Sequence, residues 1–187
     1  MPTQPTIIQQ VKDEAECLYS MKQIDDALDV MAANINQTYQ DICPIIMCVM
    51  NGGLVPMGKL LTRFDFILEV DYLHATRYRN QTNGSDLEWK ARPHVDLKGR
   101  TVLVVDDILD EGITLAKVVD YCNQQGAEKT MTAVLVEKIH DRKSGEIKAD
   151  FVGLTIEDKY VFGYGMDYKG FLRNAPGIYA VTRELLL

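Results

Sequence analysis

Three carboxylates lie close together in the sequence, where an apolar run gives way to a polar turn. Asp106 and Asp107 directly follow the buried-strand pattern of residues 101–105, and Asp110 comes shortly after them. In an open α/β sheet, ligands bind beyond the carboxyl ends of the strands. Carboxylates grouped at such a strand end can hold sugar hydroxyls, a proton or a divalent cation.

The next residues favour a phosphate group beside those acids. Glu111, Gly112, Ile113 and Thr114 form a short loop that leads into the helical pattern of residues 115–125. The free amides and the dipole at the start of a helix attract a phosphate monoester. Gly112 lets the backbone approach closely, and Thr114 offers a hydroxyl. Acids beside a phosphate loop predict a sugar phosphate ligand; the alternative is a plain strand-to-helix turn with solvated acids.

Two further segments could take part in the same chemistry. Asn51 and Gly52 follow the apolar run 45–50, where a tight turn alone would also explain them. Residues 77–92 are polar and have almost no apolar periodicity. A stretch of this length without periodicity is either a flexible surface loop or a functional lid.

A layered α/β frame is expected to hold these segments. Short apolar runs at 45–50, 101–105 and 130–136 alternate with helical patterns at 55–63 and 115–125. Strands that are apolar on both faces and alternate with helices are typical of a sheet covered on both sides. The sequence therefore predicts an α/β fold with a doubly wound, mostly parallel sheet.

The ends of the chain are expected to build a smaller part of the same domain. Apolar residues recur at helical spacing over 24–35, which predicts a helix that covers the core. The short β-like runs 151–154 and 160–164 predict a small lobe over one edge of the sheet. We expect a single domain over 1–187, with its core at roughly 40–150 and a hood from the N-terminal and C-terminal segments.

Composition narrows the class of protein further. The 187 residues carry a net charge of −7, which disfavours a general nucleic-acid binder because such proteins usually have a basic face. No apolar stretch is long enough to span a bilayer, and no signal peptide is visible, so neither a membrane nor a nucleic acid is an expected partner. We expect a cytoplasmic protein with reduced thiols at all four cysteines. These cysteines are Cys17, Cys43, Cys48 and Cys122.

The segment 104–114 resembles the phosphoribosyl pyrophosphate (PRPP) motif of the type I phosphoribosyltransferases. Over 51–173 the chain resembles the hypoxanthine-guanine phosphoribosyltransferase family. This resemblance implies the type I fold with a small hood lobe, and an enzyme that condenses hypoxanthine or guanine with PRPP. The products would be IMP or GMP plus pyrophosphate. It also implies Mg²⁺ as cofactor and a homo-oligomer, either dimer or tetramer.

The resemblance also implies roles for single residues. Asp106 and Asp107 would hold the ribose hydroxyls, directly or through magnesium, and Asp110 would be the general acid/base at purine N7. The expected ligands of the ribose and its 5′-phosphate are Asp106, Asp107, Asp110, Glu111, Gly112, Ile113 and Thr114. The expected pyrophosphate ligands are Asn51, Gly52, Arg77 and Arg173. The purine would contact Lys138 at O6, Tyr160 by stacking and Val161 through its backbone. The metal ligands would be Asp167, Asp106 and Asp107.

The chain departs from the family pattern at several of these positions. Glu111 stands where many relatives have Thr, Ile113 where a basic residue is frequent, and Asn51 where Lys is frequent. No catalytic role is expected for the three histidines, His74, His94 and His140. Two alternatives stay open: a phosphoribosyltransferase that prefers xanthine or another base, and a non-catalytic PRPP-sensing regulator that binds nucleic acid.

Overall fold

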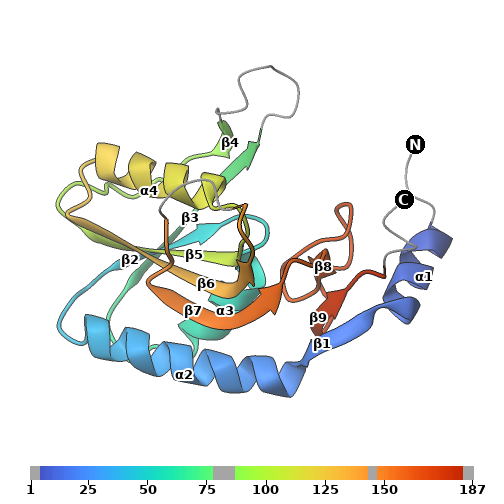
Figure 1. The fold of residues 1–187 in the computed structure, drawn as a ribbon. Coiled ribbons are helices and arrows are strands. Elements are labelled where there is room, and N and C mark those ends of the chain that lie inside the picture. Colours follow the sequence, from blue (N-terminus) through green and yellow to red (C-terminus); the bar gives the residue numbers. More distant parts are fainter. Residues whose placement is uncertain (1–4, 78–86, 143–146, 183–187) are drawn as a thin grey trace.

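A six-stranded sheet forms the centre of the computed structural model, which describes residues 5–77, 87–142 and 147–182 (Figure 1). The strand order is β4-β3-β2-β5-β6-β7, and every neighbouring pair is parallel except β3 with β4. These strands are β2 (Ile45–Val49), β3 (Glu69–Arg77), β4 (Leu87–Ala91), β5 (Thr101–Leu109), β6 (Lys129–Ile139) and β7 (Phe151–Glu157). The predicted doubly wound α/β fold is confirmed.

Helices cover both faces of this sheet because its central strands are apolar on both sides. Ile46 and Cys48 of β2 face a core formed with α2 (Met21–Tyr39) and α3 (Leu54–Leu61). The alternate residues of β2 face a second core with α4 (Ile113–Gln124). In Figure 1, α2 lies below the sheet and α4 above it. None of the described helices is long and apolar enough to cross a membrane.

A second, three-stranded sheet joins the two ends of the chain. Its order is β1-β9-β8, formed by β1 (Glu16–Ser20), β8 (Val161–Phe162) and β9 (Gly177–Ala180). Helix α1 (Pro5–Glu14) packs against it through Ile8 and Val11. Ser20 ends β1 and caps α2, where its side chain and that of Gln23 form a capping box. The two sheets lie side by side in Figure 1, joined by α2 and the β7–β8 connection.

Two expectations about the strands are wrong. The run 151–154 belongs to the main sheet, as part of the edge strand β7 parallel to β6, and not to the smaller lobe. The segment 77–92 is not loop throughout, because β4 pairs antiparallel with β3. Trp89 of β4 packs on Tyr121 of α4, with ring centroids 4.5 Å apart. Residues 78–86 of the expected lid lie outside the described residues.

Asp71 of β3 fixes the chain that returns from β4 to β5. Its side chain is buried, and Oδ2 accepts hydrogen bonds from the backbone amides of His94 at 2.6 Å and Val95 at 2.9 Å. We expect Asp71→Ala to lower the free energy of unfolding by about 3 kcal/mol, because both amides lose a charged acceptor. Urea denaturation measures this. Asp96→Ala, at an exposed acid that accepts one local bond, serves as control; an equal loss in both variants would contradict the prediction.

Candidate functional site

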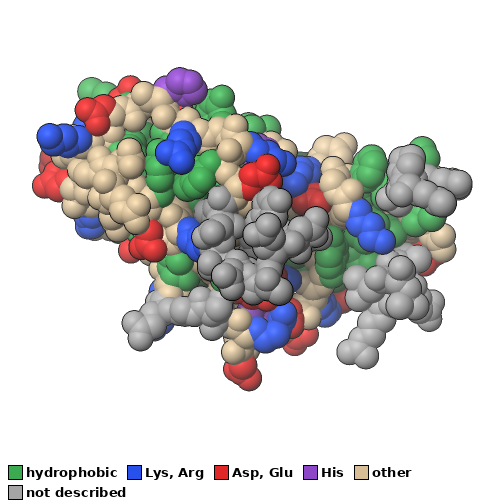
Figure 2. All heavy atoms as spheres, turned by 90° about the horizontal axis from the view of Figure 1, so that it is seen from above, with side chains coloured by type: hydrophobic (Ala, Val, Ile, Leu, Met, Phe, Trp, Pro, Cys, Tyr) green, Lys and Arg blue, Asp and Glu red, His purple; other side chains and the backbone are tan. Residues whose placement is uncertain are grey.

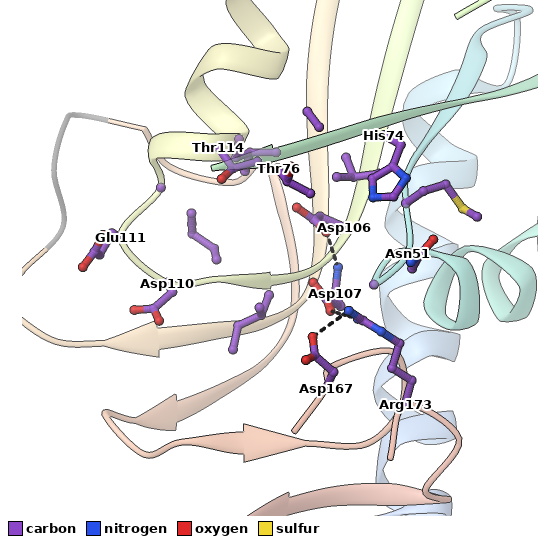
Figure 3. A pocket seen from close by; sticks show the side chains of 18 residues that line it. Asn51, His74, Thr76, Asp106, Asp107, Asp110, Glu111, Thr114, Asp167 and Arg173 are labelled. Carbon is purple, nitrogen blue, oxygen red and sulfur yellow. Dashed lines mark hydrogen bonds and ion pairs between the residues drawn. The ribbon is translucent and has the colours of Figure 1, made fainter. Parts of the chain in front are cut away.

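A cavity of about 450 Å³ opens at the carboxyl ends of β2, β3 and β5 (Figure 3). It is lined by backbone and side chains from the two polar turns that the sequence singled out, together with the segment after β8. The predicted residues that line it are Asn51, Gly52, Asp106, Asp107, Asp110, Glu111, Gly112, Thr114, Asp167 and Arg173. The structure therefore brings together ten of the residues expected at the site.

Asp106 and Asp107 lie on β5 itself, which continues to Leu109 rather than ending before the acids. Their side chains are buried, with residue exposures of 8% and 9%. Burial raises the pKa of both carboxyls, and the neighbouring Asp107 carboxyl raises that of Asp106 further. Hydrogen bonding and the charge of Arg173 act in the opposite direction on Asp107. The pair is thus suited to accept hydrogen bonds from hydroxyl groups, or to bind a cation that compensates its negative charge.

Glycines let the backbone approach this acidic pair. A Cβ at Gly52 would overlap the Asp107 carboxyl group, and one at Gly53 would lie 2.6 Å from the Val105 carbonyl oxygen. Gly165, with a φ of 109°, packs in turn against the Gly52 carbonyl oxygen. The Met50–Asn51 peptide that precedes this turn is cis. The turn after β2 therefore lies between the acids of β5 and the loop that carries Asp167.

Arg173 lies between two carboxylates of the cavity. Its Nη2 lies 2.6 Å from Asp167 Oδ1, and its Nη1 lies 4.0 Å from Asp107 Oδ2 (Figure 3). Nη1 also donates to the Gly165 carbonyl oxygen at 2.6 Å. The guanidinium is thus held in place at the cavity wall, where it offers positive charge to an anionic ligand.

The turn to which the sequence analysis assigned a phosphate leads directly into α4. Gly112 is the N-cap of α4, with a φ of 84°, a backbone conformation that favours glycine. A Cβ there would also lie 2.6 Å from Ile147 Cγ2. Glu111 and Thr114 line the cavity. Ile113 is not among the lining residues and is the first residue of α4. The backbone amides in the first turn of a helix have no partner within the helix and point out of its N-terminal end, which in α4 is the end beside the cavity.

Asp110 forms a compact cluster with Lys138 of the neighbouring strand β6 and with His140, which directly follows that strand. Lys138 Nζ donates to Asp110 Oδ2 at 2.9 Å, and His140 Nε2 lies 2.7 Å from Asp110 Oδ1. Burial alone would raise the pKa of the Asp110 carboxyl, but hydrogen bonds and charge from Lys138 and His140 outweigh it, so this pKa is lowered. Asp110 is therefore held as a carboxylate.

The remaining predicted purine ligands are Lys138 at the end of β6 and two residues at the start of the second sheet. Lys138 Nζ lies 4.0 Å from Asp158 Oδ1, and Tyr160 and Val161 come next in the chain. Tyr160 is 43% exposed, with its ring edge-on to Tyr168 at 5.7 Å between centroids. Val161 is buried in β8. Tyr160 thus offers an exposed aromatic ring, two residues after the acid that contacts Lys138.

The predicted metal ligands do not form a compact set of three. Among the described residues, the ligand atoms that lie within 4.8 Å of one another belong to Asp110, His140 and Asp158. The Lys138 ammonium already supplies positive charge to that cluster. Asp107 and Asp167 stand on either side of the Arg173 guanidinium, which explains why they do not converge.

Three cavity or cluster residues were missed by the sequence analysis. His74 and Thr76 line the cavity from alternate positions near the end of β3, and His140 follows Lys138 by two positions. Burial, followed by the charges of Lys90 and Arg173, lowers the pKa of His74. Alternate residues of a strand point to the same side, so the spacing of two was the sequence feature that could have identified these residues. Arg77 ends β3, but its side chain lies outside the described residues.

An open, mostly parallel sheet with a buried acid pair near a strand end, and a glycine-capped helix beside it, defines an α/β protein with a ligand site of the kind that suits phosphate groups. The family described as "Phosphoribosyl transferase domain" matches residues 15–169. The chain belongs to this phosphoribosyltransferase family.

Similar proteins agree with that family. A hypoxanthine-guanine phosphoribosyltransferase of Bacillus subtilis (strain 168) is 34% identical over 168 residues, which are 89% of this chain and 92% of the relative. A hypoxanthine-guanine-xanthine phosphoribosyltransferase of Tritrichomonas foetus is 29% identical, over 89% of this chain and 91% of the relative. A crystal structure of a Staphylococcus aureus hypoxanthine phosphoribosyltransferase superposes with a TM-score of 0.88 at 24% identity, and covers 100% of this chain and 99% of that one. This last likeness supports the fold.

Proposed function

We propose that this phosphoribosyltransferase serves purine salvage, by condensing hypoxanthine or guanine with PRPP to give IMP or GMP plus pyrophosphate. The observation that carries the proposal is the Asp110–Lys138 pair beside the glycine-capped start of α4. A carboxylate and an ammonium next to a phosphate site match N7 and O6, which are neighbours on one edge of a 6-oxopurine. The names of the Bacillus and Tritrichomonas relatives agree with this substrate class.

The ribose phosphate of PRPP would occupy the cavity between β5 and α4. Asp106 and Asp107 would hold its ribose hydroxyls, and the loop from Asp110 to Thr114 would hold the 5′-phosphate through backbone amides and the Thr114 hydroxyl. Loss of pyrophosphate leaves positive charge on the sugar, and the carboxylates of β5 stabilise it. The Glu111 amide would contribute to phosphate binding, while its carboxylate is directed elsewhere; its Oε1 lies 3.8 Å from Arg142 Nη1.

The pyrophosphate would lie over the turn after β2. Asn51, Gly52, Arg77 and Arg173 are its proposed ligands, and Arg173 supplies positive charge at the cavity wall. The carboxylates of Asp106, Asp107 and Asp167 do not converge on one point, because Arg173 lies between Asp107 and Asp167. Asp106 and Asp107 would therefore hold Mg²⁺ on the ribose side of the cavity and Asp167 on the pyrophosphate side, since hard oxygen donors suit that cation. When bound, Mg²⁺ would neutralise charge on the pyrophosphate oxygens.

The purine would lie between Lys138 and Tyr160. Lys138 Nζ would donate to O6, an acceptor that 6-oxopurines have and adenine lacks, while Tyr160 stacks on the ring and the Val161 backbone bonds its edge. Asp110 would take the proton from N7 as the glycosidic bond forms. Because its pKa is lowered, Asp110 is ionised and ready to act as a base at neutral pH.

An ultraviolet assay with PRPP and magnesium tests the proposal directly, offering hypoxanthine, guanine, xanthine and adenine separately. We expect turnover of hypoxanthine and guanine but not of adenine. No turnover of any base would overturn the proposal and favour the PRPP-sensing regulator. That alternative has less support, because acidic and basic side chains are interspersed on the face seen in Figure 2, where a nucleic-acid binder would show a continuous basic surface.

Xanthine use is the second candidate, because the Tritrichomonas relative is named for xanthine as well. Xanthine shares the O6 acceptor that Lys138 would recognise and differs at C2. Competition of xanthine against guanine, at equal concentration and limiting enzyme, decides between the two preferences.

The proposal includes a single-domain, cytoplasmic homo-oligomer with β1, β8 and β9 as its hood. An apolar groove of about 420 Å³ between α3 and β3 supports self-association, because Leu54, Val70 and Tyr72 expose apolar surface there. The four cysteines are free thiols, as expected in a reducing compartment. Analytical ultracentrifugation tests the assembly: a monomer at micromolar concentration would contradict it.

A further inference from the structure

His140 contacts the carboxylate that the proposed reaction uses as its acid/base. It follows β6 directly, two residues after Lys138, so both side chains leave the chain on the same side. Nε2 of His140 lies 2.7 Å from Asp110 Oδ1, and only 5% of the His140 side chain is exposed. The Asp110 side chain is 38% exposed, so this partly buried contact is better protected from solvent than a pair on the surface.

The hydrogen bond at Nδ1 of His140 determines which ring nitrogen carries the proton of the neutral ring. The backbone N–H of Arg142 donates to His140 Nδ1 at 3.1 Å. Nδ1 must therefore present its lone pair, and the neutral ring carries its proton on Nε2. This tautomer donates its hydrogen bond to Asp110.

The remaining charges near the pair are held in a network of their own. Arg142 Nη2 lies 2.5 Å from Asp158 Oδ2, and its Nη1 lies 3.8 Å from Glu111 Oε1. The charged groups around Asp110 and His140 are Lys138 on β6, Asp141 and Arg142 after it, Glu111 before α4, and Asp158 after β7. Each Asp110 oxygen thus has its own donor, and Asp158 is bound mainly to Arg142.

We propose that His140 is a positioning residue that orients the Asp110 carboxylate toward the purine, an inference that rests on the proposed function. Lys138 fixes Oδ2 and His140 fixes Oδ1, so the plane of the carboxylate cannot rotate freely. One lone pair on each oxygen stays available for the base proton. Lys138 also has to serve O6 of the purine, whereas His140 is free to hold Asp110 throughout the reaction.

The kinetic test compares His140→Ala, His140→Gln and, as a matched control, His94→Ala at an exposed histidine far along the chain. We expect His140→Ala to lower kcat about three- to tenfold, as one hydrogen bond implies. KM for PRPP should stay unchanged, because the phosphate loop is untouched, and the acid limb of the pH profile should move to higher pH. His140→Gln keeps an N–H donor near the Nε2 position and should recover most of the rate.

A titration of the Asp110 side-chain carboxyl by ¹³C NMR separates this inference from the proposed function. We expect the carboxyl to titrate at higher pH in His140→Ala than in the wild-type protein, with His140→Gln close to wild type. Identical titration in all three proteins, or a glutamine variant as slow as the alanine variant at equal thermal stability, would overturn the role of His140. If the wild-type protein transfers ribose phosphate to no purine base, the proposed function fails. The titration still tests whether His140 acts on Asp110. The glutamine variant keeps the side-chain volume, so the comparison survives if His140→Ala does not fold.

Discussion

Asp110→Asn is expected to reduce kcat for hypoxanthine and guanine by about 10²- to 10⁴-fold, the range typical of a lost general acid/base. The amide keeps the size of the carboxylate and one acceptor oxygen, but it cannot take the N7 proton. PRPP binding should persist, because the amides at the start of α4 and the Thr114 hydroxyl are unchanged. Turnover assays and PRPP binding by isothermal titration calorimetry measure the two effects separately.

Asp120→Asn is the matched control for this variant. Asp120 lies exposed on α4, in the helix that follows Asp110, and the same change of acid to amide there should leave kcat within twofold. An Asp110→Asn enzyme that keeps more than a tenth of wild-type turnover would rule out Asp110 as the base. Equal loss of PRPP binding and turnover would instead point to a role in holding the ribose phosphate.

The cavity was predictable where its residues are close in sequence. Asp106, Asp107 and Gly112 lie within one strand–turn–helix unit, and local patterns of burial and turn formation fix that unit. The turn at Gly52 was visible for the same reason, as Gly residues directly after a buried strand. The overlap of a Gly52 Cβ with the Asp107 carboxyl was not visible, because it depends on the pairing of β2 with β5.

Contacts between strands explain what the sequence analysis missed. The side chain of His140 meets Asp110 only because β6 pairs in parallel with β5, in a register that places Leu109 opposite Glu137. The residues around His140 do not predict that register. The edge strands were missed or misplaced for another reason. β4 alternates polar and apolar residues over only five positions and was not recognised, whereas β7 was recognised as a strand but assigned to the smaller lobe, since most of it is only partly buried. Weak burial gives a weak strand signal.

Lys138→Met is expected to lower kcat/KM for hypoxanthine and guanine by about 10- to 10²-fold, the cost of a lost charged donor at a buried acceptor. Discrimination against adenine should collapse, since the preference for 6-oxopurines rests on donation to O6. Met fills a similar volume, so packing at the 11% exposed Lys138 side chain is largely kept. Steady-state kinetics with each base alone measure the ratio.

The same substitution should move the acid limb of the pH profile to higher pH. Lys138 is the first of the partners that lower the pKa of Asp110, so its removal leaves only His140 to oppose burial. The carboxylate would then be protonated at a pH where the wild-type group is still ionised, and the rate would fall earlier on acidification. Lys129→Met, at the exposed start of the same strand, controls for the loss of a lysine. If Lys138→Met rejects adenine as strongly as the wild-type enzyme does, the base is selected elsewhere, and the backbone of β8 becomes the first place to search.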